Sequence, residues 1–122
     1  MNAGDTFLAP GFDDHLWMVI SDPSLDAEQV VVVCFLTAQD HYDQSCIVRS
    51  GEHPFVKHDT CVNYPAAKVT SDSKLNEHVA KGTLRLKTPL SQNLLERIRQ
   101  LAAESDMPSG AYDVLRQQGF VP

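Results

Sequence analysis

Apolar residues in this chain fall into short runs, separated by polar connections that contain proline or glycine. Residues 15–21 (HLWMVIS) and 30–36 (VVVVCFL) are nearly continuous apolar runs rich in aromatic and β-branched residues, and we expect both to be buried strands. Weaker runs predict short strands at 6–9, 45–48 and 83–87. A further strand is expected over 61–69, at an edge or with a bulge, because Pro65 has no backbone N–H to donate.

The hydrophobic period changes from that of strands to that of helices after residue 70. Ser71 is a suitable N-cap for a helix of about ten residues that ends at Gly82. A second helix is expected after Ser91, with one apolar stripe (Leu94, Leu95, Ile98, Leu101 and Ala102) and with Glu96, Arg97, Arg99 and Gln100 facing away from it. A weaker helix is expected over 112–118. Short strands followed by a packed helix predict an α+β fold, a small and partly open β-barrel with helices against it.

Length and composition bound the class of protein. The 122 residues have the size of one domain, which we expect to span 1–122 with a barrel over 3–88, a helix over 91–105 and a tail over 107–122. The longest apolar run is far shorter than the roughly 20 residues of a membrane helix, and residues 1–10 do not resemble a signal peptide. Three cysteines, an odd number, indicate reduced thiols. We therefore expect a cytoplasmic protein without membrane contact.

Charge is distributed unevenly along the chain, whose formal net charge is −6. Residues 1–48 contain eight acids and no lysine or arginine, whereas residues 49–99 carry nine bases and five acids, a balance of 9 − 5 = +4. A polyanion would be attracted to the middle of the chain and repelled by its first third. A pattern that serves solubility alone is the alternative.

The order of these runs resembles the PemK/MazF family of toxins from bacterial toxin–antitoxin pairs. Gly4-Asp5 before the first strand, residues 16–21 (LWMVIS), residues 31–37 (VVVCFLT) and residues 82–86 (GTLRL) with the following helix are similar to that family's elements. The resemblance covers about residues 3 to 103. It implies an SH3-like barrel, cleavage of messenger RNA, an antitoxin partner and a homodimer.

The chain departs from the family at positions that matter for catalysis. His15 stands where the family carries an arginine, and residues 62–66 (VNYPA) lack the arginine and the acid of a family block. Only Thr37, at the end of the third expected strand, matches a residue that helps to form the family's RNA-cleaving site.

The residues that could replace this machinery are histidines. Cleavage of RNA without a metal or other cofactor requires a base for the ribose 2′-OH, an acid for the leaving oxygen and a cation for the phosphate. Imidazoles can fill either proton-transfer role near neutral pH. The expected catalytic residues are His15, Thr37, His53 and His58, and the expected RNA-binding residues are Arg49, Lys57, Tyr64 and Lys68.

Two alternatives remain open from the sequence. Cys46, His53, His58 and Cys61 are residue types that bind zinc, although their spacing matches no zinc knuckle or ribbon. The other alternative is a barrel that binds a protein or nucleic acid without chemistry. In that case residues 53–55 (HPF) would form a structural turn with Phe55 in the core.

Overall fold

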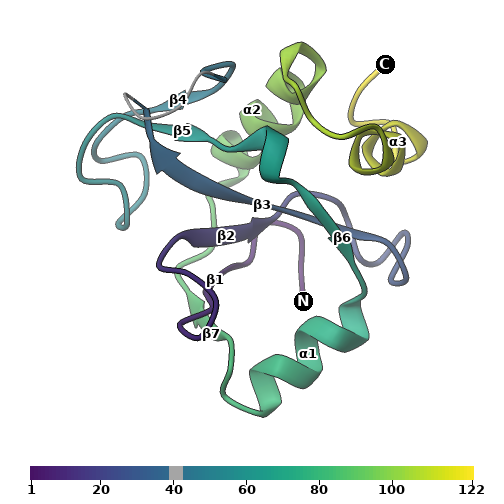
Figure 1. Cartoon of the computed structure of the whole chain (residues 1–122). Coiled ribbons are helices and arrows are strands. Elements are labelled where there is room, and N and C mark those ends of the chain that lie inside the picture. Colours follow the sequence, from purple (N-terminus) through teal and green to yellow (C-terminus); the bar gives the residue numbers. More distant parts are fainter. Residues whose placement is uncertain (39–42) are drawn as a thin grey trace.

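The computed structural model, which describes residues 1–38 and 43–122, has an α+β fold (Figure 1). The described strands are β1 (Thr6–Leu8), β2 (Leu16–Val19), β3 (Val30–Thr37), β4 (Ile47–Val48), β5 (Thr60–Val62), β6 (Lys68–Thr70) and β7 (Arg85–Lys87). The described α-helices are α1 (Asp72–Ala80), α2 (Gln92–Leu101) and α3 (Ser109–Gln117). Two short 3₁₀ helices, η2 (Tyr64–Ala66) and η3 (Ala102–Glu104), complete the described elements. The α+β class expected from the sequence is confirmed.

The seven described strands form one antiparallel sheet in the order β4-β5-β3-β2-β1-β7, with β6 also paired to β3. The long strand β3 lies at its centre: β2 pairs with one of its edges, and β5 and β6 share the other. This sheet is not closed into a barrel, because β4 and β7, at the two ends of the described order, each pair with one neighbour only.

The single strand expected over 61–69 is wrong, because this segment forms two strands with a 3₁₀ turn between them. Pro65 fixes its own φ and has no N–H for a ladder, and it lies in the first turn of η2. The turn moves the chain along β3, so that β5 pairs with residues 35–37 and β6 with residues 30–32. One proline thus lets a single segment line most of one edge of β3.

Alternation along the central strands gives the sheet two apolar faces. Leu16, Met18, Val31 and Val33 point to one face, where they pack with buried residues of α2 and α3 in the main core. The alternate residues of the strands point to the other face. There they form a smaller cluster with Leu75 of α1, made of Phe7, Trp17, Val19, Val30, Val32 and Cys34. The expected burial of Trp17 is confirmed.

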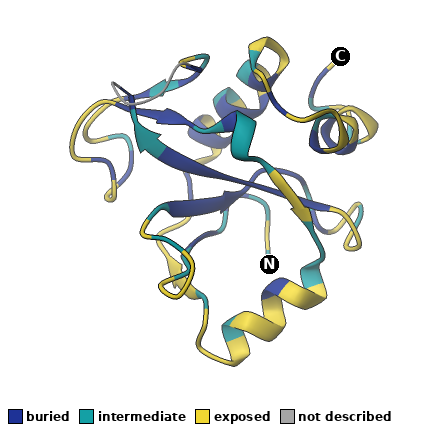
Figure 2. Ribbon diagram, viewed as in Figure 1, coloured by how far each residue is buried: buried dark blue, intermediate teal, exposed yellow. Residues whose placement is uncertain are grey.

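The two faces are covered unequally, as Figure 2 shows. Helices α2 and α3 bury several residues each, whereas Leu75 is the only buried residue of α1, which is otherwise largely exposed. A helix that buries one residue cannot shield from solvent a face to which several strands contribute. The second face therefore remains partly open to solvent beside α1.

The capping serines confirm the expected starts of two helices. Ser71 Oγ accepts a hydrogen bond from Lys74 N at 3.3 Å, and Ser91 Oγ accepts one from Leu94 N at 3.1 Å. Gly82, with a φ of +78°, follows α1 in the left-handed conformation that favours glycine. None of the helices in the described ranges combines the length and the apolar character of a membrane span.

Arg99 departs from the expectation that it faces away from the apolar stripe of α2. Its side chain is buried, with Nε donating to Ile20 O at 2.5 Å and the guanidinium 3.6 Å from the centre of the Phe120 ring. Phe120, which lies beyond the end of α3, thus covers the Arg99 guanidinium of α2. The chain after residue 107 also contributes to the main core, through Ala111, Val114, Leu115 and Val121.

Candidate active site

A groove of about 260 Å³ lies where β2 begins, β3 ends and β5 begins. Three of the four histidine and threonine residues proposed from the sequence line it: His15, Thr37 and His58. These residues are distant in the sequence and come together because β2 and β5 flank β3. We call this the histidine groove.

Strand pairing explains why His15 and Thr37 lie at the same end of the sheet. Strand β2 runs antiparallel to β3 with Trp17 opposite Cys34, so the residue before β2 lies near the C-terminal end of β3. The turn into β2 is held by Asp13, whose carboxylate accepts hydrogen bonds from His15 N and from Trp17 Nε1, each at 3.1 Å. The backbone of His15 is therefore fixed by its neighbours.

The other imidazole is placed by the start of β5. Thr60 is the cross-strand partner of Thr37. Its Oγ1 donates to His58 O at 3.0 Å, and Nδ1 of His58 lies 3.2 Å from Asp59 O. His58 is exposed and His15 is partly exposed, so both rings are accessible from solvent while their backbones are tied to the sheet. Two accessible imidazoles on one groove can supply a proton donor and a proton acceptor near neutral pH.

Five further residues that the sequence pattern did not indicate line the histidine groove: Asp14, Phe35, Leu36, Phe55 and Thr60. Phe55 is 44% exposed, so the interpretation that it fills the core is wrong; Val56, the next residue, is buried instead. Asp14 has its carboxylate 3.9 Å from Nδ1 of His15. Asp14 could have been selected from the sequence, because it is next to His15. Thr60 could not, because its place at the groove follows from its pairing with Thr37.

His53 does not line the histidine groove, because it is buried and bonded to the backbone. Its Nδ1 accepts a hydrogen bond from Phe55 N at 3.1 Å, so Nε2 carries the proton and donates to Thr88 O at 2.7 Å. The ring joins the 50–59 connection to the segment after β7. This is the structural role that the binding-module alternative gave to the residue.

Tyr64 and Lys68 also lie apart from the histidine groove. Tyr64 is fully buried and its hydroxyl donates to Ile98 O at 2.6 Å, so it offers no surface to RNA. Burial raises the pKa of Tyr64 well above its usual value. Lys68, on β6, has its Nζ 5.8 Å from the centre of the Phe12 ring, on the face that α1 covers.

The two remaining cations, Arg49 and Lys57, lie just before and within the 50–59 connection, which carries His58. Arg49 follows β4 and forms an ion pair with Asp59, the residue after His58. Lys57 is exposed and precedes His58 in the chain. Both are therefore placed beside the histidine groove by chain connection, although neither lines it.

The four proposed zinc ligands are not gathered in the structure. Among the described residues, which include all four, no group of three or more His, Cys, Asp or Glu side chains could hold a metal ion. Cys46 and Cys61 are buried, and burial raises the pKa of both thiols.

Comparison with protein-family models, with curated proteins and with solved structures gave no match for this chain.

Proposed function

We propose that this protein is a metal-independent endoribonuclease that cleaves RNA in the histidine groove, as the resemblance to PemK/MazF toxins implies. The observation that carries the proposal is that His15 and His58, which are far apart in the sequence, line one groove. Thr37, the residue that the resemblance carries over to this chain, lines the same groove.

The proposed reaction is attack of a ribose 2′-oxygen on the adjacent phosphorus. One imidazole accepts the 2′-OH proton as the new O–P bond forms, and the bond from phosphorus to the 5′-oxygen breaks. The other imidazole, in its protonated form, donates a proton to the departing 5′-oxygen. The products are a 2′,3′-cyclic phosphate and a 5′-hydroxyl, so protons and electrons balance without a metal or an oxidant.

Other residues at the groove have roles that suit an RNA chain. The Thr37 hydroxyl can donate a hydrogen bond to a phosphate oxygen, and Lys57 beside His58 can contribute positive charge. Phe55 presents an exposed aromatic ring on which an unpaired base can stack. We propose single-stranded RNA as the substrate, since stacking and splayed phosphates require unpaired bases.

The SH3-like arrangement is proposed from the resemblance alone; an antiparallel sheet with helices packed on it supports only the α+β class. Two further parts of the proposal follow from that resemblance: formation of a homodimer and control by an antitoxin protein encoded nearby. Action in the cytoplasm is proposed from the odd number of cysteines, which indicates reduced thiols.

Incubation of the purified protein with a long single-stranded RNA in EDTA tests this function. We expect cleavage by the parent protein and a loss of about 100-fold or more in rate for His15→Ala and for His58→Ala, the usual effect of removing a general acid or base. Lys57→Ala should reduce cleavage less, and Lys74→Ala, a lysine on the exposed surface of α1, is its matched control. Thermal unfolding of each variant shows whether the fold is retained.

Equal cleavage by the parent protein and both histidine variants would contradict the proposal, because neither imidazole would then be needed for the reaction. No cleavage by the parent protein, when RNAs of varied sequence have been tried, would favour a binding module. Cleavage that EDTA abolishes would contradict the metal-independent mechanism.

A further inference from the structure

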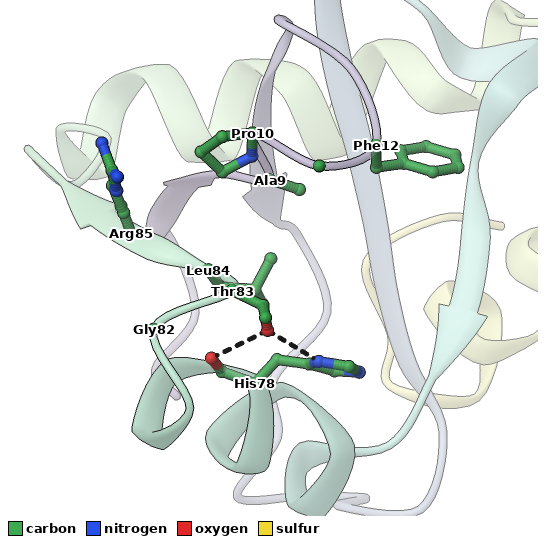
Figure 3. Close-up of a pocket in the computed structure, with 9 residues that line it drawn as sticks. Ala9, Pro10, Phe12, His78, Gly82, Thr83, Leu84 and Arg85 are labelled. Carbon is green, nitrogen blue, oxygen red and sulfur yellow. Dashed lines mark hydrogen bonds between the residues drawn. The ribbon is translucent and has the colours of Figure 1, made fainter.

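Two adjoining hollows on the face covered by α1 form an apolar groove that is separate from the histidine groove. They measure about 620 Å³ and 450 Å³, and Ala9, Phe12, His78 and Leu84 line both. We call their union the Phe12 groove. Figure 3 shows its first part, between the turn at residues 9–12 and the segment 82–85 that leads into β7. Among residues 1–38 and 43–122, none lines both this groove and the histidine groove.

The Phe12 groove exists because the smaller cluster of the sheet is incompletely covered. Trp17 and Val32 form part of its floor, and α1 contributes only Leu75 as a buried residue. At its rim Phe12 is 68% exposed and Val69 is 43% exposed. Exposed apolar side chains gathered around a hollow are a common mark of a binding surface, whereas single ones are ordinary.

Positive charge accompanies this apolar surface. Lys68 and Arg85 line the two hollows, and no aspartate or glutamate that the structure describes does. Neither cation forms an ion pair with any residue that the structure describes. The nearby carboxylate of Asp13 is occupied by the Trp17 indole. A ligand with apolar side chains and negative charge would therefore complement the groove.

The strand beside the groove offers backbone as well. β7 is the last strand of the described order and pairs on one side only, with β1. Its middle residue, Leu86, is 52% exposed and lies between Arg85 and Lys87. An open strand edge with flanking cations can accept an extended acidic segment as an additional strand.

We propose that the Phe12 groove binds an extended, acidic peptide segment of a partner protein, with a large apolar side chain of that segment in the hollow. An extended peptide accounts for the apolar lining, the unpaired cations and the open edge of β7 together. Nucleic acid fits less well, since a polyanion would meet mostly aliphatic and aromatic side chains and only two lining cations. This proposal does not depend on RNA cleavage and would stand if the histidine groove were inactive.

A phage-displayed library of linear twelve-residue peptides, selected on the full chain, provides the probe. We expect enriched sequences to contain Asp or Glu around a large apolar residue. The affinity of a synthesised winner, measured by fluorescence anisotropy, should fall about tenfold or more for Phe12→Ser, because truncation of an aromatic anchor removes much of the binding energy. Leu25→Ser, at a leucine that is 63% exposed and lines neither hollow, is the matched control and should leave the affinity unchanged.

Charge reversal tests the acidic character of the ligand. Lys68→Glu combined with Arg85→Glu should weaken binding and reduce its dependence on salt, whereas Arg116→Glu, on α3, should do neither. RNA cleavage by Phe12→Ser, which changes no charge and no residue of the histidine groove, should be unaffected, and this separates the proposal from the proposed function.

Several results would overturn the proposal. One is a selection that yields no acidic peptide, and another is equal binding by Phe12→Ser and Leu25→Ser. Binding of a labelled single-stranded RNA, lost in Phe12→Ser, would make the groove a nucleic-acid site. A dimer in sedimentation experiments that Phe12→Ser dissociates, together with no peptide binding, would assign the groove to a second copy of the chain.

Discussion

Arg97 on α2 holds Glu52 of the 50–59 connection through two hydrogen bonds, from Nη1 to Oε1 at 2.7 Å and from Nη2 to Oε2 at 3.0 Å. Arg97 Nη2 also lies 3.3 Å from Ile47 O, and Glu52 Oε2 accepts a hydrogen bond from Arg49 N at 2.6 Å. The 50–59 connection, which carries His58, is thus attached near its start to α2. Both side chains are partly buried, so the pair is less screened than a surface ion pair.

This ion pair should make stability depend on pH. The hydrogen bonds from Arg97 lower the pKa of the Glu52 carboxyl below its ordinary value. A lowered folded-state pKa gives stability that is present above the unfolded-state pKa and is lost as the pH falls through the folded-state value. We expect Glu52→Gln to lower the free energy of unfolding by about 1 kcal/mol at neutral pH and by much less near pH 3.

Urea unfolding of the parent protein and Glu52→Gln at both pH values measures this difference. Glu77→Gln, which breaks the exposed pair with Lys81, is the control and should change little at either pH. A deficit of equal size at neutral and acid pH would show that the charge of Glu52 is not its cause.

The two histidines of the 50–59 connection should separate stability from activity. His53→Ala removes a buried ring that bonds Phe55 N and Thr88 O, and we expect it to cost about 2–4 kcal/mol of unfolding free energy. His58→Ala removes an exposed ring and should cost less than about 0.5 kcal/mol while abolishing RNA cleavage. Denaturant unfolding and the cleavage assay on both variants measure the two effects. A large loss of stability in His58→Ala, or a loss of cleavage in a folded His53→Ala protein, would contradict the prediction.

The strands and helices with strong local signals were predictable from the sequence. The apolar runs 15–21 and 30–36 contain β2 and β3, and the serines at 71 and 91 are the caps of α1 and α2. Segment 61–69 was harder, since its apolar content does not show that Pro65 begins a 3₁₀ turn between two strands. The exposure expected for Arg99 is wrong for a different reason. Helical periodicity shows which residues share a face of α2, but it does not show that Phe120, from another part of the chain, covers Arg99.

The histidine groove could be predicted only in part, for a similar reason. The sequence shows that His15 and His58 are residues able to transfer protons. It does not show which histidine of a polar segment is buried and which is exposed. Burial, which distinguishes His53 from His58, depends on contacts with the segment after β7. The Phe12 groove was not foreseen, because it results from how little of the sheet α1 covers.

The three cysteines should be unreactive while the protein is folded. All three are buried, and burial raises the pKa of Cys34 to about 12. We expect no fast reaction with a thiol reagent such as dithionitrobenzoate under native conditions, and reaction of three thiols per chain in denaturant. The rate should follow global unfolding as denaturant is added. Rapid modification of one thiol in the native protein would show that its segment opens locally.

Arg99 should contribute to stability through its packing more than through its charge. Burial lowers the pKa of its guanidinium, and Nη2 has no hydrogen-bond partner among the described residues, so the charge is poorly compensated. The stem and the flat guanidinium nevertheless fill the space beneath Phe120. We expect Arg99→Met, which keeps the volume and removes the charge, to change the unfolding free energy by less than about 1 kcal/mol. Arg99→Ala should cost about 2 kcal/mol or more, because it leaves a cavity against Phe120. Denaturant unfolding of the two variants compares them, and equal losses would mean that the hydrogen bond from Nε to Ile20 O, absent from both, dominates the role of Arg99.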